Sequence, residues 1–225
     1  MRGNLKFILL VSISLLLFSC TNSVKNYVIP GKLFGRVKSL AYTHFSVNEK
    51  YGEVQKTALR GSASYKFNDK GKATEGSEST IDNGWGEITT YSFDDAGKVV
   101  SDVRRRENSQ TIEYTTVYNY DDKGNLTDKT VNDNSKSMFT YDSRGNVSQS
   151  KVYDSRGNLS EVVQDHYDSK DQLIGEDLSD VNSSSNNRVF TYKLDGIDKH
   201  GNWTKRTLYE NAKPIIMTVR EIEYY

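Results

Sequence analysis

Aromatic and polar residues alternate along most of the chain from about residue 33 onward. Tyr65 and Phe67 flank one polar residue, and Tyr91 and Phe93 repeat the arrangement. Alternation with a period of two, rich in aromatic and β-branched side chains, is typical of antiparallel strands that bury one face. No convincing helical stretch follows the N-terminal segment. The pattern therefore predicts an all-β protein.

A seven-residue motif separates the alternating stretches. It consists of an aromatic or apolar residue, Asp or Asn, two mostly polar residues, Gly, Asn or Lys, and an apolar residue. Successive copies start 26, 27, 21, 12, 14 and 30 residues apart, so the motif is constant and its spacing is not. This favours a repeated turn over a strictly periodic solenoid. The copies begin at Phe67, Phe93, Tyr120, Tyr141, Tyr153, Tyr167 and Ile197.

The chemistry of the motif is that of a hairpin turn. The Asp or Asn side chain can accept hydrogen bonds from backbone N–H groups further along the turn, and Gly adopts the left-handed conformation at little cost. Asp171 replaces this Gly in the sixth copy and tolerates the same conformation less well. The predicted structural turn glycines are Gly71, Gly97, Gly124, Gly145, Gly157 and Gly201.

A type I turn that ends on a left-handed Gly closes a hairpin on a bulge, and it places the first motif residue opposite the seventh. The expected pairs are Phe67 with Ala73, Phe93 with Val99, Tyr120 with Leu126, Tyr141 with Val147, Tyr153 with Leu159, Tyr167 with Leu173, and Ile197 with Trp203. We predict a single antiparallel β-meander of repeated hairpins. Since twist accumulates over a dozen or more strands, we expect a curled or partly closed sheet.

The N-terminal segment has a different character. Arg2 and Lys6 precede an apolar run over residues 7–17, which is too short to span a bilayer and typical of a signal peptide. Cys20, the only cysteine, follows this run and resembles the modified cysteine of the bacterial lipobox, although Phe18 stands where a small residue is usual. An ordinary secretory signal with an incidental cysteine is the alternative.

The lipobox resemblance implies lipidation of Cys20 and three regions. These are a signal peptide over residues 1–19, a lipidated N-terminus and tether over residues 20–31, and a β-domain over residues 32–225. No Asp follows Cys20, which by resemblance to sorting signals favours the outer membrane, on its periplasmic face or at the cell surface.

The motif YDxxGNL resembles the YD repeat, also called the RHS repeat, between about Tyr65 and Trp203. The C-terminal residues 200–225 also resemble the end of small Bacteroidetes-type lipoproteins. Large RHS proteins use such strands to build a hollow shell around a toxin. This chain has seven copies and no released effector domain, so we do not expect the shell function.

Candidate catalytic and metal-binding groups are sparse. His44, His166 and His200 lie far apart in the sequence, and the acidic turns do not complete a calcium loop. The formal net charge is zero, which argues against capture of nucleic acid by bulk charge. We therefore expect no enzyme activity, no metal and no cofactor. Asn125, Asn146, Asn158 and Asn202 form Asn-x-Ser/Thr sequences, which we attribute to the turn motif.

Tyrosine is abundant, with 15 copies, and rings of this kind can bind sugars. The main interpretation is that the rings form the hydrophobic half of the sheet in a membrane-tethered structural or interaction module, with a glycan or an envelope protein as possible partner. The alternative is a carbohydrate-binding module with exposed aromatics. The candidate ligand-binding residues are Tyr118, Tyr120, Tyr141, Tyr153 and Trp203.

Overall fold

The computed structural model describes residues 33–82, 85–132 and 134–225. The expected signal peptide, Cys20 and the whole of the tether lie outside these residues. Almost all of the described chain is β-strand, apart from the turns and one three-residue 3-10 helix, η1 (Ser184–Asn186). The strands are β1 (Val37–Lys50), β2 (Glu53–Phe67), β3 (Ala73–Asp82), β4 (Trp85–Phe93), β5 (Val99–Arg106), β6 (Ile112–Tyr120), β7 (Leu126–Val131), β8 (Ser135–Tyr141), β9 (Val147–Tyr153), β10 (Leu159–Tyr167), β11 (Leu173–Asp180), β12 (Arg188–Ile197), β13 (Trp203–Glu210) and β14 (Lys213–Tyr224).

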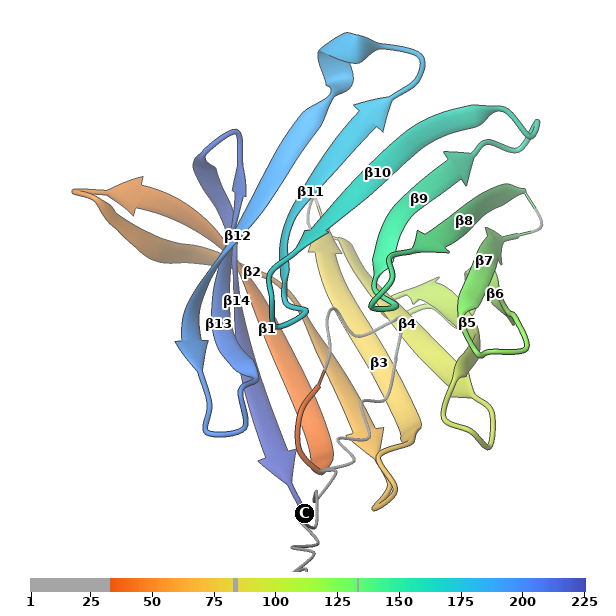
Figure 1. Cartoon of the computed structure of the whole chain (residues 1–225), viewed down its shortest axis with the longest axis horizontal. Coiled ribbons are helices and arrows are strands. Elements are labelled where there is room, and N and C mark those ends of the chain that lie inside the picture. The colour runs from red at the N-terminus through yellow and green to blue at the C-terminus, as the bar shows by residue number, and fades with distance from the viewer. Residues whose placement is uncertain (1–32, 83–84, 133) are drawn as a thin grey trace, which may run out of the picture.

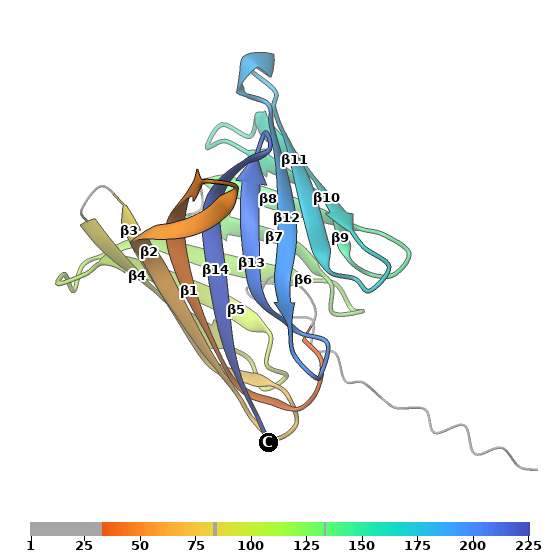
Figure 2. The ribbon, with the colours of Figure 1, turned by 90° about the vertical axis from the view of Figure 1, so that its left-hand side faces the viewer.

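Each strand pairs with the next in antiparallel fashion, and β14 returns to pair with β1, so the sheet is a closed barrel (Figure 1). The seam joins nine residue pairs, from Val37 opposite Tyr224 to Ser46 opposite Ile216. Figure 2 shows β1, β14 and β13 side by side in this part of the wall. The predicted all-β antiparallel meander is confirmed. The expectation of a curled or partly closed sheet is wrong, because the first and last strands satisfy each other's free edges.

The register of the motif hairpins agrees with the sequence prediction. All seven expected pairs, from Phe67 with Ala73 to Ile197 with Trp203, lie directly opposite each other across a hairpin. In each of these hairpins the pairing register shifts next to the motif pair, as a bulged turn requires. A further irregularity of the register lies between Leu194 and Ile197, at the Asp195–Gly196 pair.

The topology separates the motif copies between the two ends of the barrel. Six copies join an even-numbered strand to the following odd-numbered one, and they share one end with the start of β1 and the end of β14; we call this end the turn rim. The copy that begins at Tyr153 joins β9 to β10 at the opposite end, the far rim. The spacing explains this division, because intervals of 12 and 14 residues cover one strand and one turn, whereas intervals of 21 to 30 residues cover two strands and two turns.

The hydrophobic core fills the barrel next to the turn rim. Leu40 and Tyr65 are each only 1% exposed, and Trp203 is 2% exposed. They belong to one cluster that also contains Leu33, Val37, Tyr42, Ala63, Phe67 and Ala73. The strand residues of this cluster lie toward the turn-rim ends of their strands, and Leu33 precedes β1 at the same rim, so the core resembles a floor at one end of the barrel.

The outward positions of the strands are mostly polar, with exposed apolar side chains at Val117, Met138 and Val189 among them. Lys66 and Glu75 form a cross-strand ion pair of 2.6 Å on this face, and the hydroxyls of Ser64 and Ser77 lie 3.2 Å apart beside them. Polar outward and aromatic inward positions give the strands the alternation seen in the sequence. Within the ranges that the structure describes, no helix has the length and apolar character needed to cross a bilayer.

Candidate functional site

Tyrosine hydroxyls bonded to carboxylates line the barrel interior beyond the core. Burial, followed by the negative charge of the partner, raises the pKa of each of these tyrosines above its usual range, so the phenols keep their protons and act as donors. For Tyr192 the partner's negative charge is likewise the second cause. The pairs are Tyr65 with Glu78 at 2.6 Å, Tyr118 with Asp102 at 2.7 Å, and Tyr192 with Glu176 at 2.6 Å.

Two buried arginines flank the indole ring of Trp203. The Arg220 guanidinium carbon lies 3.5 Å from a Trp203 ring centroid, and that of Arg206 lies 4.5 Å away. Arg206 also stacks on Tyr192 at 4.3 Å, and Arg220 donates a 2.8 Å hydrogen bond to the hydroxyl of Tyr42. Burial lowers the pKa of both guanidinium groups, and the nearby tyrosines oppose that shift. The arrangement places two positive charges against one aromatic floor.

A row of three polar side chains crosses the barrel seam at the level of these arginines. His44 on β1 lies opposite Thr218 on β14, which in turn lies opposite Arg206 on β13. His44 Nδ1 is 3.0 Å from Thr218 Oγ1, and the His44 ring stacks on Tyr42. Burial lowers the pKa of His44, which favours the neutral imidazole. His44 is half-buried, whereas His166 and His200 are exposed.

Two carboxylates face each other on neighbouring strands of the interior. Asp165 on β10 lies directly opposite Glu176 on β11. Burial, followed by repulsion from Glu176, raises the pKa of Asp165 to about 7. The Tyr167 hydroxyl bonds to Asp165 at 3.4 Å, whereas Glu176 is bound by Tyr192. In the described part of the chain, no group of three or more His, Cys, Asp or Glu side chains could hold a metal ion.

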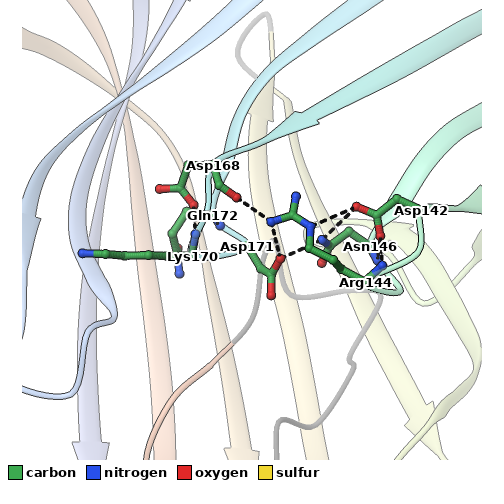
Figure 3. A network of polar contacts seen from close by, with 7 residues as sticks. All are labelled: Asp142, Arg144, Asn146, Asp168, Lys170, Asp171 and Gln172. Atoms are coloured by element: carbon green, nitrogen blue, oxygen red, sulfur yellow. Dashed lines mark hydrogen bonds and ion pairs between the residues drawn. The ribbon is translucent and has the colours of Figure 1, made fainter.

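The turns of the turn rim are bonded to one another (Figure 3). Arg144 in the β8–β9 turn reaches the β10–β11 turn, where it donates to the Asp168 carbonyl at 2.8 Å and pairs with Asp171 at 2.9 Å. Asn146 donates to the same Asp171 carboxylate at 3.0 Å. Asp171, with φ of 60°, thus takes the left-handed position of the missing Gly and also supplies a contact that Gly could not.

The last turn fastens both ends of the described chain. The Asn202 side chain accepts from the Phe34 backbone N–H at 2.8 Å and donates to the Phe34 carbonyl at 2.7 Å. It also donates to the Tyr224 hydroxyl, which in turn donates to Asp198. Asn202 is completely buried, and it therefore serves the fold as the turn interpretation of its Asn-x-Thr sequence requires.

The structure brings four of the five candidate aromatics to the inward face of the sheet. Trp203 is buried in the core, and Tyr118, Tyr120 and Tyr141 are half-buried. Tyr153 lies opposite Lys136 and on the same outward face as the exposed Lys151, so the sheet separates it from the other four. The Tyr120 hydroxyl donates to the Val99 carbonyl and that of Tyr141 to the Leu126 carbonyl, each at 2.7 Å. Each of these two rings therefore bonds to the backbone at the end of the preceding turn-rim hairpin. The six candidate turn glycines all have φ between 77° and 91°.

Sequence reasoning missed the charged residues of the interior, Glu78, Asp102, Lys129, Asp165, Glu176, Arg206 and Arg220. A charged residue in an alternating strand is normally assigned to the solvent face, and here both faces carry charges. The alternation of side chains along a strand could have placed one of them. Arg220 and Tyr224 are separated by an even number of positions, so Arg220 must share the face of the aromatic Tyr224.

Comparison with known proteins gives weak structural likenesses. No protein-family model and no curated protein matches the chain. A porin-like protein from Bacteroides uniformis ATCC 8492 is 12% identical with a TM-score of 0.47, over 85% of this chain and 99% of that one. The Photorhabdus luminescens Tc holotoxin pore is 14% identical with a TM-score of 0.22, over 77% of this chain. A TcdB2-TccC3-Cdc42 structure is 15% identical over 75%, with a TM-score of 0.23. The match covers only 10% of each toxin chain.

Proposed function

We propose that the chain is a non-enzymatic lipoprotein of the bacterial cell envelope, tethered through Cys20 and acting as a structural or interaction module. The observation that supports this best is the division of chemistry across the barrel wall. Most rings and bonded charges face inward, whereas the outward positions are mostly serine, threonine and ion-paired side chains such as Lys66 and Glu75. Such a wall is suited to water on its outer side, so membrane attachment would come from an acyl chain.

The position of the first described residues gives the tethered barrel an orientation. Leu33 packs into the core, and Asn202 binds Phe34 at the turn rim. A lipid on Cys20 would therefore hold the turn rim toward the membrane and direct the far rim away from it. The motif resemblance leads us to infer that the chain is related to YD-repeat lipoproteins, with the repeat serving to build the barrel.

Replacement of the lipidated residue tests the tether. We expect the wild-type protein to partition into the membrane fraction and to incorporate labelled palmitate, and the Cys20→Ser variant to lose the label and become extractable without detergent. Thermal unfolding of the two proteins should be the same, because the barrel begins well after residue 20. Ser19→Ala is the matched control. Retention of Cys20→Ser in the membrane after an alkaline wash would show that the barrel itself enters the bilayer.

Carbohydrate binding stays a prediction of the sequence. The hydroxyls of Tyr118 and Tyr120 are already bonded, to Asp102 and to the Val99 carbonyl, so a sugar would have to contact the rings themselves. A glycan array can distinguish the carbohydrate-binding function from the structural one. Strong binding of the wild-type protein that is lost in Tyr118→Ala would favour carbohydrate binding.

A further inference from the structure

Arg206 is a buried positive charge held by rings. Its side chain lies inside the barrel on β13, the whole residue is 9% exposed, and its guanidinium lies between Tyr192 and Trp203. Stacking covers the two faces of the planar group, while the N–H groups around its edge remain able to donate. Over residues 33–82, 85–132 and 134–225, no carboxylate oxygen lies within 4.0 Å of this guanidinium and it makes no hydrogen bond.

Other groups already occupy the carboxylates that could neutralise Arg206. Glu176 accepts the hydroxyl of Tyr192 at 2.6 Å, and Glu78 accepts that of Tyr65 at 2.6 Å. Glu176 acts on Arg206 from a greater distance, since its charge partly offsets the lowering of the Arg206 pKa by burial. A buried guanidinium that has no anion in direct contact is costly, so a bound anion would be favoured at this point.

The neighbouring strands place a threonine and a histidine in line with Arg206. Thr218 lies between Arg206 and His44 in the cross-strand row. If the Thr218 hydroxyl donates to His44 Nδ1, the neutral imidazole carries its proton on Nε2, and this proton points away from Thr218. Arg220, on the other side of Trp203, adds positive potential without leaving its partner Tyr42.

We propose that the row of His44, Thr218 and Arg206 is an anion-binding site inside the barrel, and that it takes a small oxyanion such as phosphate, sulfate or a carboxylate group. Arg206 supplies the charge and a fork of donors, and His44, on the other side of Thr218 in the row, serves as the reporter of binding. The core floor around Trp203 closes the site on the side of the turn rim, so the ligand enters from the far rim. This site goes beyond the structural role and does not depend on membrane attachment.

Histidine NMR of the full chain in detergent provides the test. The chain has three histidines, and His166 and His200 are exposed, so they serve as internal references. Titration with sodium phosphate, sodium sulfate or sodium acetate, at ionic strength kept constant with sodium chloride, should shift the His44 ring signals in a saturable way. The His166 and His200 signals should move only slightly. Preference among the three salts distinguishes a tetrahedral oxyanion from a carboxylate.

Variants then assign the response to Arg206. Arg206→Met keeps an apolar chain between the two rings and removes the charge, so the dissociation constant should rise by roughly tenfold or more. Arg188→Met is the matched control, because Arg188 also lies over an aromatic ring, that of Phe190, but its side chain is exposed. Glu176→Gln should strengthen binding by removing a competing negative charge.

Three results would overturn the assignment. They are a His44 signal that responds no more than His166 and His200 in the wild-type protein, equal binding by Arg206→Met, and weaker binding by Glu176→Gln. The first is independent of any variant, so failure of a variant to fold leaves the proposal open to refutation.

Discussion

Single residues in the barrel interior combine two kinds of interaction that are usually separate. A tyrosine such as Tyr65 packs its ring into the core and donates its hydroxyl to Glu78. The ring supplies apolar burial, and the hydroxyl satisfies a carboxylate that would otherwise be costly to bury. The abundance of tyrosine over phenylalanine in the chain follows from this double use, because Phe could fill the same space but would leave the carboxylate without a donor.

The Asp165–Glu176 pair predicts a pH dependence of stability. The folded state holds a proton on Asp165 up to a pKa of about 7, whereas the unfolded chain releases it near the ordinary value of 3.8. The contribution of Asp165 to the free energy of unfolding is therefore full at pH values below about 4 and is lost as the pH rises through 7. Since the side chain is partly exposed, we expect the change to be on the order of 1–2 kcal/mol.

Asp165→Asn should remove this dependence. Denaturant unfolding should show the variant to be more stable than the wild type at pH 8. The difference in the free energy of unfolding should shrink toward pH 4.5, where the side chain at position 165 of the folded protein is neutral in both the wild type and the variant. Asp122→Asn, an exposed change in the β6–β7 turn, is the control and should show no such convergence. A stability difference that is constant from pH 4.5 to 8 would contradict the assignment of the raised pKa to Asp165.

At the scale of elements, the repeated hairpin was readable from the sequence because its determinants are local. Asp or Asn and Gly fix the turn, and the turn fixes the register, so the opposition of Tyr120 and Leu126 follows without knowledge of the rest of the chain. The contacts between successive turns are not local. Arg144 reaches Asp171 only because β9 and β10 together bring the two turns to the same rim. No pattern within one motif copy indicates that contact.

Gly97 and Gly157 have the same left-handed conformation but different surroundings. Substituting each in turn therefore distinguishes the free-energy cost of the left-handed conformation from the cost of packing against a neighbouring turn. A Cβ at Gly97 would lie 2.8 Å from the backbone N of Ala73 in the neighbouring turn, whereas a Cβ at Gly157 meets nothing within 4 Å. Both have φ near 80°. We expect Gly157→Ala to lower the free energy of unfolding by about 1–2 kcal/mol, which is the cost of the left-handed conformation.

Gly97→Ala should cost more than Gly157→Ala, because the backbone of the adjacent turn must move as well; overpacking adds roughly 1–3 kcal/mol. Chemical denaturation of both variants gives the comparison. Equal losses would mean that the turns at the turn rim do not pack against one another as the structure shows.

At the scale of the whole molecule, closure of the barrel is the property that could not be predicted from the sequence. The alternating pattern gives the number of strands and their order, but closure depends on the accumulated twist and stagger of all of them. The ends of the barrel are also fixed by contacts between distant residues. Asn202 joins Phe34 to Tyr224, and these three residues lie in separate parts of the sequence. A similarly long stretch of sequence separates His44 from Arg206, so the candidate anion site becomes visible only in the folded barrel.

The closed barrel predicts a covalent link between its first and last strands. Thr43 on β1 lies directly opposite Val219 on β14, and both positions point away from the interior. In a Cys20→Ser background, Thr43→Cys with Val219→Cys should crosslink in high yield under oxidising conditions or with a short bis-maleimide. The disulfide should stabilise the barrel by about 2–4 kcal/mol, since it closes a long loop in the unfolded chain. Non-reducing gel mobility and thermal unfolding measure the two effects.

The matched control combines Thr43→Cys with Val117→Cys on β6, which is far from β1 around the wall. A partly closed sheet would leave the edges of β1 and β14 apart, and the seam pair would then crosslink no better than this control. The crosslink also tests the core indirectly. Tyr42 and Arg220 face each other across the same seam and meet Trp203 from the next strand, so the aromatic floor can form only when the seam is closed. A chain that failed to crosslink would lack both the floor and the row of His44, Thr218 and Arg206, and the anion titration should then fail together with the crosslink.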